Sequence, residues 1–384
     1  MSLERELLGG KFRIEDRKND HIRICAERDV GAKEISTGFR DVYLIHRALP
    51  EINLSDIRTE ISFLGHSFSA PIIVEGMTGG TEKAMEINAA IAEAVEELRL
   101  GMGVGSQRAA IEKPNLERTY RIVREKAPNA FIAANIGGAQ LAAGYTIKEV
   151  ASAIDMIGAD ALVIHLNPLQ EAIQPEGETL YAGILQKISY LANRLDVPII
   201  VKETGCGISC EVARMLEGAG VSCIDVAGAG GTSWAAVEYY RAAERGDTYG
   251  QDLGLIFWDW GIPTVVSLVE VVNSVRIPVI ASGGVRAGLD IAKSIALGAS
   301  LAGIARPVLL AALKGPKETK RFLMSLVSQL KCAMFLTGAK SIEDLKRVPL
   351  VIVGKTAEWL RARGFNPDLL YARRSGVSEW ACLI

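Results

Sequence analysis

The sequence is poor in the features that mark several specialised classes of protein. Aromatic residues account for only 6% of its 384 residues, and no apolar run approaches the length of a membrane span. The formal net charge is −2, with acidic and basic residues intermixed, which gives no reason to expect a nucleic acid or an anionic membrane as partner. An anionic ligand would therefore have to be bound by a local site.

Cysteine spacings that hold metals or cross-link secreted folds are also missing. The six cysteines are scattered without zinc-type pairs, so Cys206 and Cys210 are interpreted as small buried residues and reduced thiols are expected. Residues 1–6 carry charges where a signal peptide needs an apolar core. These observations predict a cytoplasmic protein.

Glycine, by contrast, is abundant. The chain has 38 glycines against 13 prolines, and 49% of its residues are hydrophobic. This composition suits a large core crossed by many short strand-to-helix turns. No Pro/Ser-rich or low-complexity linker marks a boundary, so one main domain is favoured over two smaller ones.

Two stretches in the C-terminal third organise the rest of the chain. Residues 278–288 and 300–307 each begin as a run of small and β-branched residues, typical of a strand buried on both faces. Gly283 and Gly284 allow a sharp turn, and a helix expected from about Ala287 directs the positive end of its dipole at the same point. The pattern indicates a phosphate site where a (β/α)8 barrel commonly has one, after its last two strands.

The rest of the chain repeats the same strand-and-helix unit. Strand-like runs occur at 71–75, 101–105, 130–135, 161–165, 198–202 and 222–226, and with the two glycine-rich units they make eight. Alternating strands and helices favour a parallel sheet, and eight units predict a closed (β/α)8 TIM barrel. A doubly wound open sheet is the alternative. Its glycine fingerprint would usually follow the first strand, whereas glycine turns here recur on nearly every strand.

The regions around the barrel complete the predicted organisation. Residues 1–60 are expected to form an N-terminal arm with a short helix that contributes to the substrate site, 61–345 the barrel, and 346–384 a C-terminal helical extension. Alternating apolar and polar residues at 61–68 predict a hairpin that closes the barrel floor. The long connection 227–263 is interpreted as a lid.

The strand ends of a barrel converge on one mouth, so residues far apart in sequence become neighbours. The expected mouth is rich in amides and cations, with no Ser-His-Asp order and no evident acid–base pair of carboxylates. A bound cofactor would supply the missing chemistry. The polar residues at these positions are Thr78, Ser106, Gln107, Arg108, Asn135, His165, Asn167, Gln170, Glu171, Lys202, Thr232, Arg286 and Arg306.

Several of these residues have two interpretations. Lys202 ends an apolar strand and could stabilise negative charge on a reduced flavin, or simply pair with a neighbouring Glu. Glu171 could hold Mg2+ against a diphosphate, or be a solvated loop acid. His165 could face the mouth or be a core histidine. The cluster at 17–21 could clamp a diphosphate or form a solvated charged face.

A series of motifs then resembles one family. These are Arg17-Lys-x-x-His21, Glu75-Gly-Met-Thr-Gly-Gly80, Gly105-Ser-Gln-Arg108, Asn135-Ile-Gly, His165-Leu-Asn-Pro-Leu-Gln-Glu171 with Pro175-Glu-Gly177, Val201-Lys-Glu-Thr-Gly205, Gly228-Ala-Gly-Gly-Thr-Ser-Trp234, Asp259-Trp-Gly-Ile-Pro-Thr264 and Ser282-Gly-Gly-Val-Arg286. Together they resemble the type 2, FMN-dependent isopentenyl-diphosphate isomerases, from about Ile14 to Arg347. The resemblance implies a TIM barrel that interconverts isopentenyl and dimethylallyl diphosphate.

The resemblance also implies roles for individual residues. FMN would be held by Met77, Thr78, Ser106, Asn135, Lys202, Thr232, Gly284, Val285, Arg286, Ala305 and Arg306. The diphosphate substrate would meet Arg17, Lys18, His21, Ser106, Gln107, Arg108, His165, Asn167 and Gln170, with Glu171 on Mg2+. Ala227 stands where many relatives carry a serine, so a hydroxyl contact to the flavin would be missing.

The expected chemistry explains the lack of a side-chain acid–base pair. Moving a double bond by one carbon needs a proton added and another removed, without net redox, through a cationic intermediate. Reduced FMN beneath the alkene could exchange the proton and stabilise the positive charge, assisted by Gln170 and His165. Reduced FMN, Mg2+ and NADPH as reductant are therefore expected, in an enzyme of isoprenoid precursor biosynthesis. Relatives imply a homo-oligomer, a tetramer or octamer.

Three other functions share parts of this pattern. An FMN oxidoreductase acting on a small 2-hydroxy acid would share the flavin site but needs a strand-end His base and an Arg for the carboxylate. A purine-nucleotide dehydrogenase or reductase would use Cys206 as nucleophile. A non-catalytic flavin-binding protein would show colour without turnover of any diphosphate.

Overall fold

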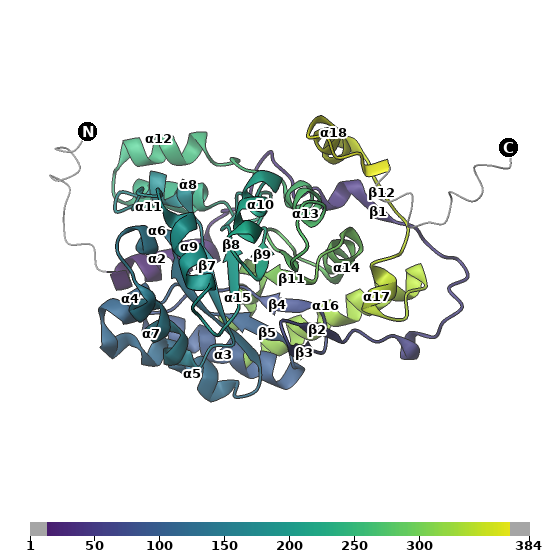
Figure 1. Cartoon of the computed structure of the whole chain (residues 1–384), viewed down its shortest axis with the longest axis horizontal. Coiled ribbons are helices and arrows are strands. Elements are labelled where there is room, and N and C mark those ends of the chain that lie inside the picture. Colours follow the sequence, from purple (N-terminus) through teal and green to yellow (C-terminus); the bar gives the residue numbers. More distant parts are fainter. Residues whose placement is uncertain (1–13, 369–384) are drawn as a thin grey trace.

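A computed structural model describes residues 14–368 of the chain. Eight parallel strands form a closed barrel in the order β10-β11-β4-β5-β6-β7-β8-β9 (Figure 1). The strands are β4 (Ile72–Val74), β5 (Gly101–Gly103), β6 (Phe131–Gly137), β7 (Ala161–His165), β8 (Ile199–Lys202), β9 (Cys223–Asp225), β10 (Val279–Ala281) and β11 (Leu301–Ile304). Closure confirms the predicted (β/α)8 barrel and excludes the open sheet.

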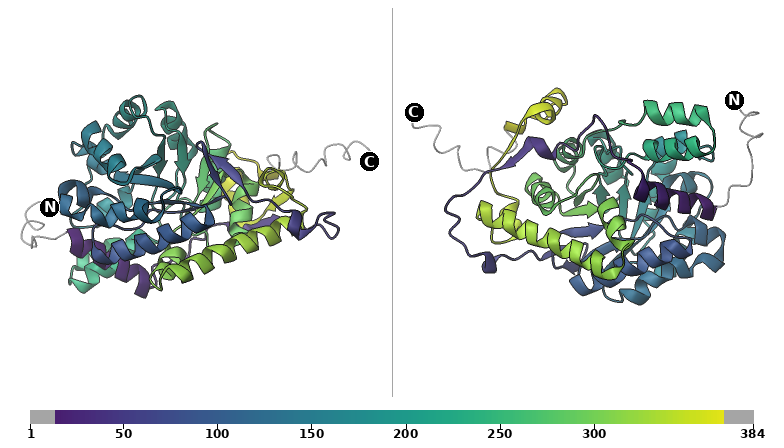
Figure 2. Two further views of the ribbon diagram at one scale, coloured as in Figure 1. Left: turned by 90° about the horizontal axis from the view of Figure 1, so that it is seen from below. Right: turned by 180° about the vertical axis from the view of Figure 1, so that it is seen from behind.

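Helices cover the outside of the barrel, and three of those named below begin at a side-chain cap. Thr81 accepts from the backbone N–H of Ala84, Thr146 forms a capping box with Glu149, and Ser209 caps the helix after β8. The covering helices are α3 (Glu82–Leu98), α5 (Arg118–Lys126), α7 (Ile147–Ile157), α9 (Ile184–Ala192), α10 (Cys210–Gly218), α13 (Thr264–Val272), α14 (Gly288–Leu297) and α16 (Pro316–Thr337). The long helix α16 runs along one side of the barrel (Figure 2).

The floor of the barrel is closed by the predicted hairpin, β2 (Ile61–Phe63) and β3 (His66–Phe68). Phe63 and Phe68 meet the ring of Phe131 at centroid distances of 5.9 and 5.5 Å. A Cβ on Gly101 would lie 2.5 Å from the Phe68 ring, so this strand position must remain glycine. The bottom of the barrel is therefore a packed core, which leaves the opposite end for a site.

The long connection after β9 is not a lid loop. It folds into α11 (Trp234–Glu244), capped by Ser233, and α12 (Thr248–Ile256), capped by Asp247, and the two helices pack together. The Trp258 ring packs at 5.6 and 5.9 Å from Tyr239 and Tyr240. The lid interpretation is wrong because helix caps and aromatic packing order this segment.

Short helices surround the mouth. They are α4 (Arg108–Glu112), α6 (Gly138–Ala142), α8 (Pro168–Ile173) and α15 (Arg306–Ala312). A 3-10 turn at Pro114–Leu116 follows α4, and two others lie on the arm at Phe39–Asp41 and Leu54–Asp56. The arm contributes α2 (Ile14–Glu27), which lies against α11 and α15. Among residues 14–368, no helix is both long enough and apolar enough to cross a membrane.

The arm and the C-terminal extension also contact each other. β1 (Val42–Leu44) pairs antiparallel with β12 (Leu350–Ile352), next to α18 (Gly354–Ala362) at the upper right of Figure 1, and α17 (Ile342–Leu345) precedes them. Asp41 accepts hydrogen bonds from the backbone N–H and the hydroxyl of Thr356, at 3.1 and 2.6 Å. The two terminal regions thus form one small unit on the outside of the barrel.

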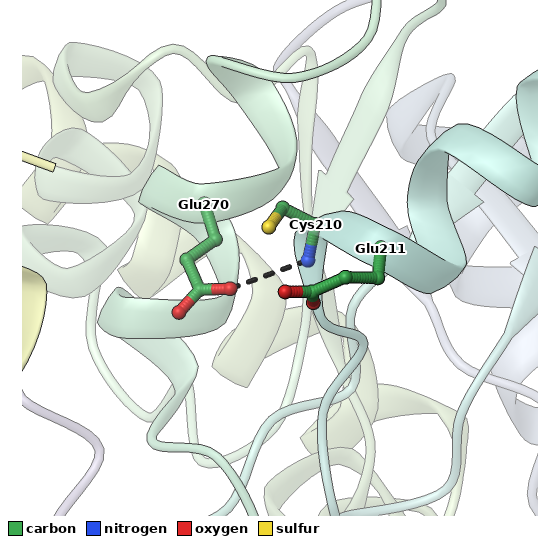
Figure 3. Close-up of side chains that lie close together, drawn as sticks. All are labelled: Cys210, Glu211 and Glu270. Carbon is green, nitrogen blue, oxygen red and sulfur yellow. Dashed lines mark hydrogen bonds between the residues drawn. The ribbon is translucent and has the colours of Figure 1, made fainter. Parts of the chain in front are cut away.

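An ion-pair cluster holds this unit to the barrel. Cys210, Glu211 and Glu270 lie close enough to suggest a metal site, and the backbone N–H of Cys210 donates to Glu270 (Figure 3). The Arg363 guanidinium, however, pairs with Glu270 at 2.9 Å and with Glu211 at 2.7 Å. The cluster therefore carries its own cation, and it fixes the end of α18 to α10 and α13.

Replacing Arg363 with alanine would leave the buried Glu270 carboxylate without its cation. We expect Arg363→Ala to lower the free energy of unfolding by about 1–2 kcal/mol, less than the ~3–5 kcal/mol of a fully buried pair, because solvent reaches Arg363. Urea unfolding would measure the change. The matched control is Arg361→Ala, whose partner Asp368 is exposed and which should change stability little. Equal effects of the two substitutions would contradict the assignment.

Candidate active site

A cavity of about 480 Å3 opens where the strands end. The barrel brings every predicted site residue but one to its wall. Those lining it are Arg17, Lys18, His21, Met77, Thr78, Ser106, Arg108, Asn135, His165, Asn167, Gln170, Glu171, Lys202, Thr232, Gly284, Val285, Arg286, Ala305 and Arg306. Placement in the cavity supports the roles that the resemblance implies.

Gln107 is the exception, and its predicted contact with substrate is corrected. The side chain is completely buried, donates to the backbone carbonyl of Ala153 at 2.8 Å and accepts from the backbone N–H of Asn135 at 2.9 Å. It therefore points away from the cavity and ties the end of β6 to α7. Its neighbours Ser106 and Arg108 line the cavity instead.

The glycine turn after β10 forms an open backbone seat. Gly283 and Gly284 have φ values of 95° and 75°, and a Cβ on Gly283 would lie 2.2 Å from the carbonyl oxygen of Gly228. Within residues 14–368 the backbone N–H groups of Gly284 and Val285 have no hydrogen-bond acceptor. Two free donors at the start of α14 suit an anion such as a phosphate.

Arg306 lines the cavity and also contacts the N-terminal arm. Its guanidinium donates to the backbone carbonyls of Cys25 and Arg28, at 2.8 and 3.0 Å. The side chain therefore ties the end of α2 to the barrel. Sequence patterns give no sign of this contact, because it joins residues that are 281 and 278 positions apart.

The arm supplies cations over the cavity. Lys18 donates to the backbone carbonyl of Ser106 at 3.0 Å, and neither Arg17 nor Lys18 forms an ion pair within residues 14–368. Burial lowers the pKa of Lys18 to about 7, helped by the positive charges of Arg17 and Arg108. Arg17 and Lys18 stand beside Arg108, which already pairs with two glutamates, and the three can bind a multiply charged anion.

His165 ends β7 and faces the cavity, as predicted. Its Nδ1 lies 2.7 Å from the side-chain oxygen of Asn135, which can only accept, so Nδ1 carries the proton. Burial lowers the pKa of His165 to about 3, and the charges of Lys202 and Lys18 add to the effect. A neutral His165 can hydrogen-bond a ligand but is a very weak base.

Gln170 and Glu171 lie on α8, beside the arm. The Glu171 carboxylate accepts from the side chains of Asn167 and Gln174, at 2.9 and 2.7 Å, and from the backbone N–H of Glu178 at 2.7 Å. No lysine, arginine or histidine of residues 14–368 pairs with it. A buried carboxylate surrounded by neutral donors fits a cation-binding role, and the solvated-loop interpretation does not hold.

A charged pair on α11 was missed by sequence reasoning. Glu238 is buried and accepts from His21 at 3.0 Å and from Gln170 at 3.4 Å, while Arg241 binds its other oxygen at 2.5 Å. Burial opposes its ionisation, but hydrogen bonds and charge from His21 and Arg241 hold the pKa of Glu238 at about 2. The sequence presents residues 227–263 as a long connection. The spacing of three residues between Glu238 and Arg241 indicates a contact only where the segment is helical.

Two further residues bear on the chemistry. Burial raises the pKa of the Cys206 thiol well above its usual value, which argues against a nucleotide dehydrogenase that uses this thiol as nucleophile. Ala227 lines the cavity with a φ of 38°, a left-handed conformation that residues other than glycine rarely adopt.

The cavity accepts FMN on chemical grounds. The seat at Gly284 and Val285 offers free backbone donors for a phosphate, and the Thr78 hydroxyl is buried without a partner among residues 14–368. An unpaired buried hydroxyl costs free energy unless a ligand engages it. Lys202 also lines the cavity and adds a charged donor.

The fold and the site together define a flavin barrel. The family model described as FMN-dependent dehydrogenase matches residues 145–351. Solved structures of mandelate oxidase are similar, one with (S)-mandelic acid giving a TM-score of 0.61 at 18% identity over 92% of this chain and 98% of that chain. This similarity shows the barrel fold.

Comparison with curated proteins is more specific. An isopentenyl-diphosphate delta-isomerase of Methanothermobacter thermautotrophicus is 51% identical over 94% of this chain and 100% of its own length. One of Pyrococcus furiosus is 49% identical over 90% of this chain and 89% of its own. The chain belongs to the isopentenyl-diphosphate delta-isomerase family, which confirms the resemblance inferred from its motifs.

The perturbed Lys18 predicts a proton-linked binding step. An amine with a pKa near 7 is mostly neutral at pH 8 and must gain a proton to pair with an anion. We expect inorganic diphosphate to bind at pH 8 with uptake of up to about one proton, and more weakly as pH rises above 7. Calorimetry in two buffers of different ionisation enthalpy measures the uptake.

Lys18→Met should abolish that uptake. Lys113→Met is the control, because Lys113 already pairs with Glu15 at 2.7 Å and should leave the uptake unchanged. Diphosphate binding without proton uptake by the unmodified chain would contradict the role of Lys18.

Glu238 predicts a pH-dependent contribution to stability. Its pKa is depressed in the folded chain, so its contribution is present above its unfolded pKa near 4.5 and is lost as pH falls toward 2. We expect Glu238→Gln to lower the free energy of unfolding at pH 7 by roughly 3 kcal/mol. The deficit should shrink between pH 5 and about 3, as followed by denaturant unfolding.

Glu244→Gln provides the control for this prediction. Glu244 lies at the surface of α11, the helix that also carries Glu238, and pairs with Arg23 of α2. Such surface pairs contribute at most about 1 kcal/mol. A deficit of Glu238→Gln that stays constant between pH 7 and pH 3 would show that the charge of Glu238 is not its cause.

Proposed function

We propose that this chain interconverts isopentenyl diphosphate and dimethylallyl diphosphate without net redox, as a step in isoprenoid precursor biosynthesis. The observation that carries the proposal is the composition of the cavity. Cations of the arm stand over it, and amides and a neutral histidine line its side, which suits a diphosphate with an uncharged hydrocarbon tail. Family membership supports the same activity.

The cofactor proposal assigns one wall of the cavity to FMN. Its phosphate would meet the backbone donors of Gly284 and Val285 with Arg286 nearby, and its ring would lie near Thr78 and Lys202. Bound and reduced, FMN would supply a proton donor and acceptor together with negative charge that favours a cationic intermediate. The remaining proposed contacts are Met77, Ser106, Asn135, Thr232, Ala305 and Arg306.

The substrate proposal assigns the opposite, arm-covered side to the diphosphate. Arg17, Lys18 and Arg108 would bind its charge, and His21 and Ser106 would complete the contact. Glu171 would hold Mg2+ against the diphosphate, because Mg2+ prefers carboxylate and phosphate oxygens. The position of the arm in this structure supports action on its own barrel.

The hydrocarbon part would then lie between the amides and the ring. Asn167 and Gln170 are hydrogen-bonded to each other at 3.1 Å, and Gln170 is also held by Glu238. His165 is fixed by Asn135 with Nε2 unprotonated. These neutral groups would orient the alkene and exclude water without competing for its proton.

We further propose the cellular setting that the sequence suggests. NADPH would reduce the flavin, the protein would act in the cytoplasm, and it would assemble as a tetramer or octamer. The division into an arm at 1–60, a barrel at 61–345 and an extension at 346–384 remains a proposal, although the arm and extension pair through β1 and β12.

Anaerobic turnover tests this function. The protein is supplied with FMN, Mg2+ and NADPH, isopentenyl diphosphate is added, and dimethylallyl diphosphate and NADPH are followed together. We expect product only after flavin reduction and without stoichiometric loss of NADPH, because the reaction transfers protons and no net electrons. Glu171→Gln should raise the Mg2+ concentration needed for half-maximal rate at least tenfold.

Two results would contradict the proposal. Stoichiometric NADPH consumption would indicate an oxidoreductase. Oxidation of a 2-hydroxy acid without isomerisation would favour that alternative function over the isomerase.

A further inference from the structure

Three ionisable groups share the floor of the cavity. Glu75 follows β4, Lys202 ends β8 and Asp225 ends β9, and their exposed fractions are 9%, 8% and 1%. The ammonium of Lys202 lies 3.6 Å from a Glu75 oxygen and 3.9 Å from an Asp225 oxygen. Glu75 and Lys202 line the large cavity, and all three groups also line a small cavity of about 10 Å3 inside the barrel.

The charge of this group does not balance if every member is ionised. Two carboxylates face one ammonium, and a buried net negative charge is costly. Neighbouring carboxyl groups relieve this cost by sharing one proton. The group then carries no net charge.

The hydrogen bonds identify which carboxyl is ionised. Asp225 accepts from the hydroxyl of Ser282 at 2.6 Å and from the backbone N–H of Ala227 at 3.3 Å, and such donors stabilise a carboxylate. No backbone N–H or hydroxyl of residues 14–368 donates to Glu75. The proton therefore belongs on Glu75, and burial and Asp225 raise the pKa of Glu75 to about 8.

The barrel makes space for the Glu75 side chain. A Cβ on Gly303 of β11 would lie 2.0 Å from a Glu75 oxygen, so only glycine at that position leaves the carboxyl in place. Glu75 therefore occupies a site formed by the neighbouring strand and is not a loosely held acid.

The other charged groups near this floor surround Lys202. Glu203 follows it in sequence, and its carboxylate accepts the backbone N–H groups of Thr204, Gly205 and Cys206. Burial nevertheless raises the pKa of Glu203 to about 7. His165 pairs with Lys202 across the β7–β8 register and is neutral. Among residues 14–368, Glu203 is thus the other carboxyl group on this side that can hold a proton near neutral pH, whereas burial raises the pKa of the Cys223 thiol well above its usual value.

Lys202 has hydrogen-bonding capacity left for a ligand. Its ammonium makes one short hydrogen bond, to the backbone carbonyl of Glu203 at 2.8 Å, and lies beyond 3.5 Å from both carboxyl partners. An ammonium has three donors. The remaining donors can serve a group in the large cavity.

We propose that Glu75 is a neutral carboxylic acid that shares a proton with Asp225, so that Lys202 presents a charged ammonium to an anionic ring in the large cavity. Glu75 is then a positioning residue that sets the charge at the floor. Where the ring is taken to be reduced FMN, this inference rests on the proposed function. Above the pKa of Glu75 its ionisation adds negative charge beside Lys202 and disfavours an anionic ligand.

The first test needs no cofactor. Infrared spectra of the full chain at pH 7 should show protonated-carboxyl C=O absorption to which Glu75 and, in part, Glu203 contribute. The Glu75 band should be lost in Glu75→Gln and retained in the matched variant Glu203→Gln. In the unmodified chain the band should fade as pH passes about 8. A band retained in Glu75→Gln and lost in Glu203→Gln would overturn the proposal, as would a band unchanged up to pH 10.

The second test uses FMN bound to the protein. The midpoint potential of the flavin should be the same in the unmodified chain and in Glu75→Gln at pH 7, because glutamine mimics the neutral acid. Above about pH 8 the potential of the unmodified chain alone should fall further, as Glu75 ionises. A markedly higher potential for Glu75→Gln at pH 7 would mean that Glu75 is normally ionised, and would overturn the proposal.

The two tests separate this inference from the proposed function. If the chain binds no FMN, the proposed function fails, whereas the infrared test still decides the protonation of Glu75. If Glu75→Gln does not fold, the pH titration of the carboxyl band in Glu203→Gln decides the question, because that variant lacks the other carboxyl group that titrates nearby.

Discussion

Closure of the eight-stranded barrel is the constraint on which the site depends. β11, the last barrel strand, pairs with β4, the first barrel strand, and β10 pairs with β9. The ring therefore has no free edge. Parallel strands in a closed ring have all their carboxyl ends on one side. The polar residues that follow the individual strands therefore meet at one mouth, and the Phe-rich hairpin closes the other end.

Charge is distributed unequally around that mouth. The arm brings Arg17 and Lys18 to the outer side, where neither has a carboxylate partner among residues 14–368 and a multiply charged ligand can replace solvent. At the floor of the cavity, Lys202 lies near the carboxyl groups of Glu75 and Asp225. Asp225 accepts a hydrogen bond from Ser282, so the charged forms of the two carboxyl groups are stabilised to different extents. A buried carboxylate on α11 links the arm to α8, because Glu238 binds both His21 and Gln170. Helix α11 thus links His21, which is proposed to contact the diphosphate, with Gln170, which is proposed to contact the hydrocarbon part of the substrate.

The flavin-barrel fold is shared with enzymes of other chemistry. Mandelate oxidase structures superpose along most of the chain at low sequence identity, which shows a common barrel fold. The difference lies in groups attached to the strand ends. His165 is held neutral by burial and by two lysines, which suits orientation of a ligand more than removal of a proton from it. The arm and α8, outside the repeated barrel units, carry the proposed diphosphate and Mg2+ contacts.

Much of the site followed from sequence because it depends on local rules. Glycine turns, strand lengths and residues next to strand ends can be found from spacing, so Lys202, His165 and Gly284 were predicted in the mouth. Two errors mark the limit of that approach. Gln107 lies between two cavity residues but turns away to bond Ala153 on α7. Residues 227–263 contained capped helices where a lid was expected.

The sequence by itself determined the eight strand-and-helix units, the glycine seat and the family, because each depends on residue order and local backbone geometry. Only the tertiary structure decided which charges meet. Glu238 with His21, Arg306 with the end of α2, and Glu75 with Lys202 and Asp225 join residues from distant parts of the chain. The physical reason is that charge and protonation depend on burial and on partners across space, which no local pattern records.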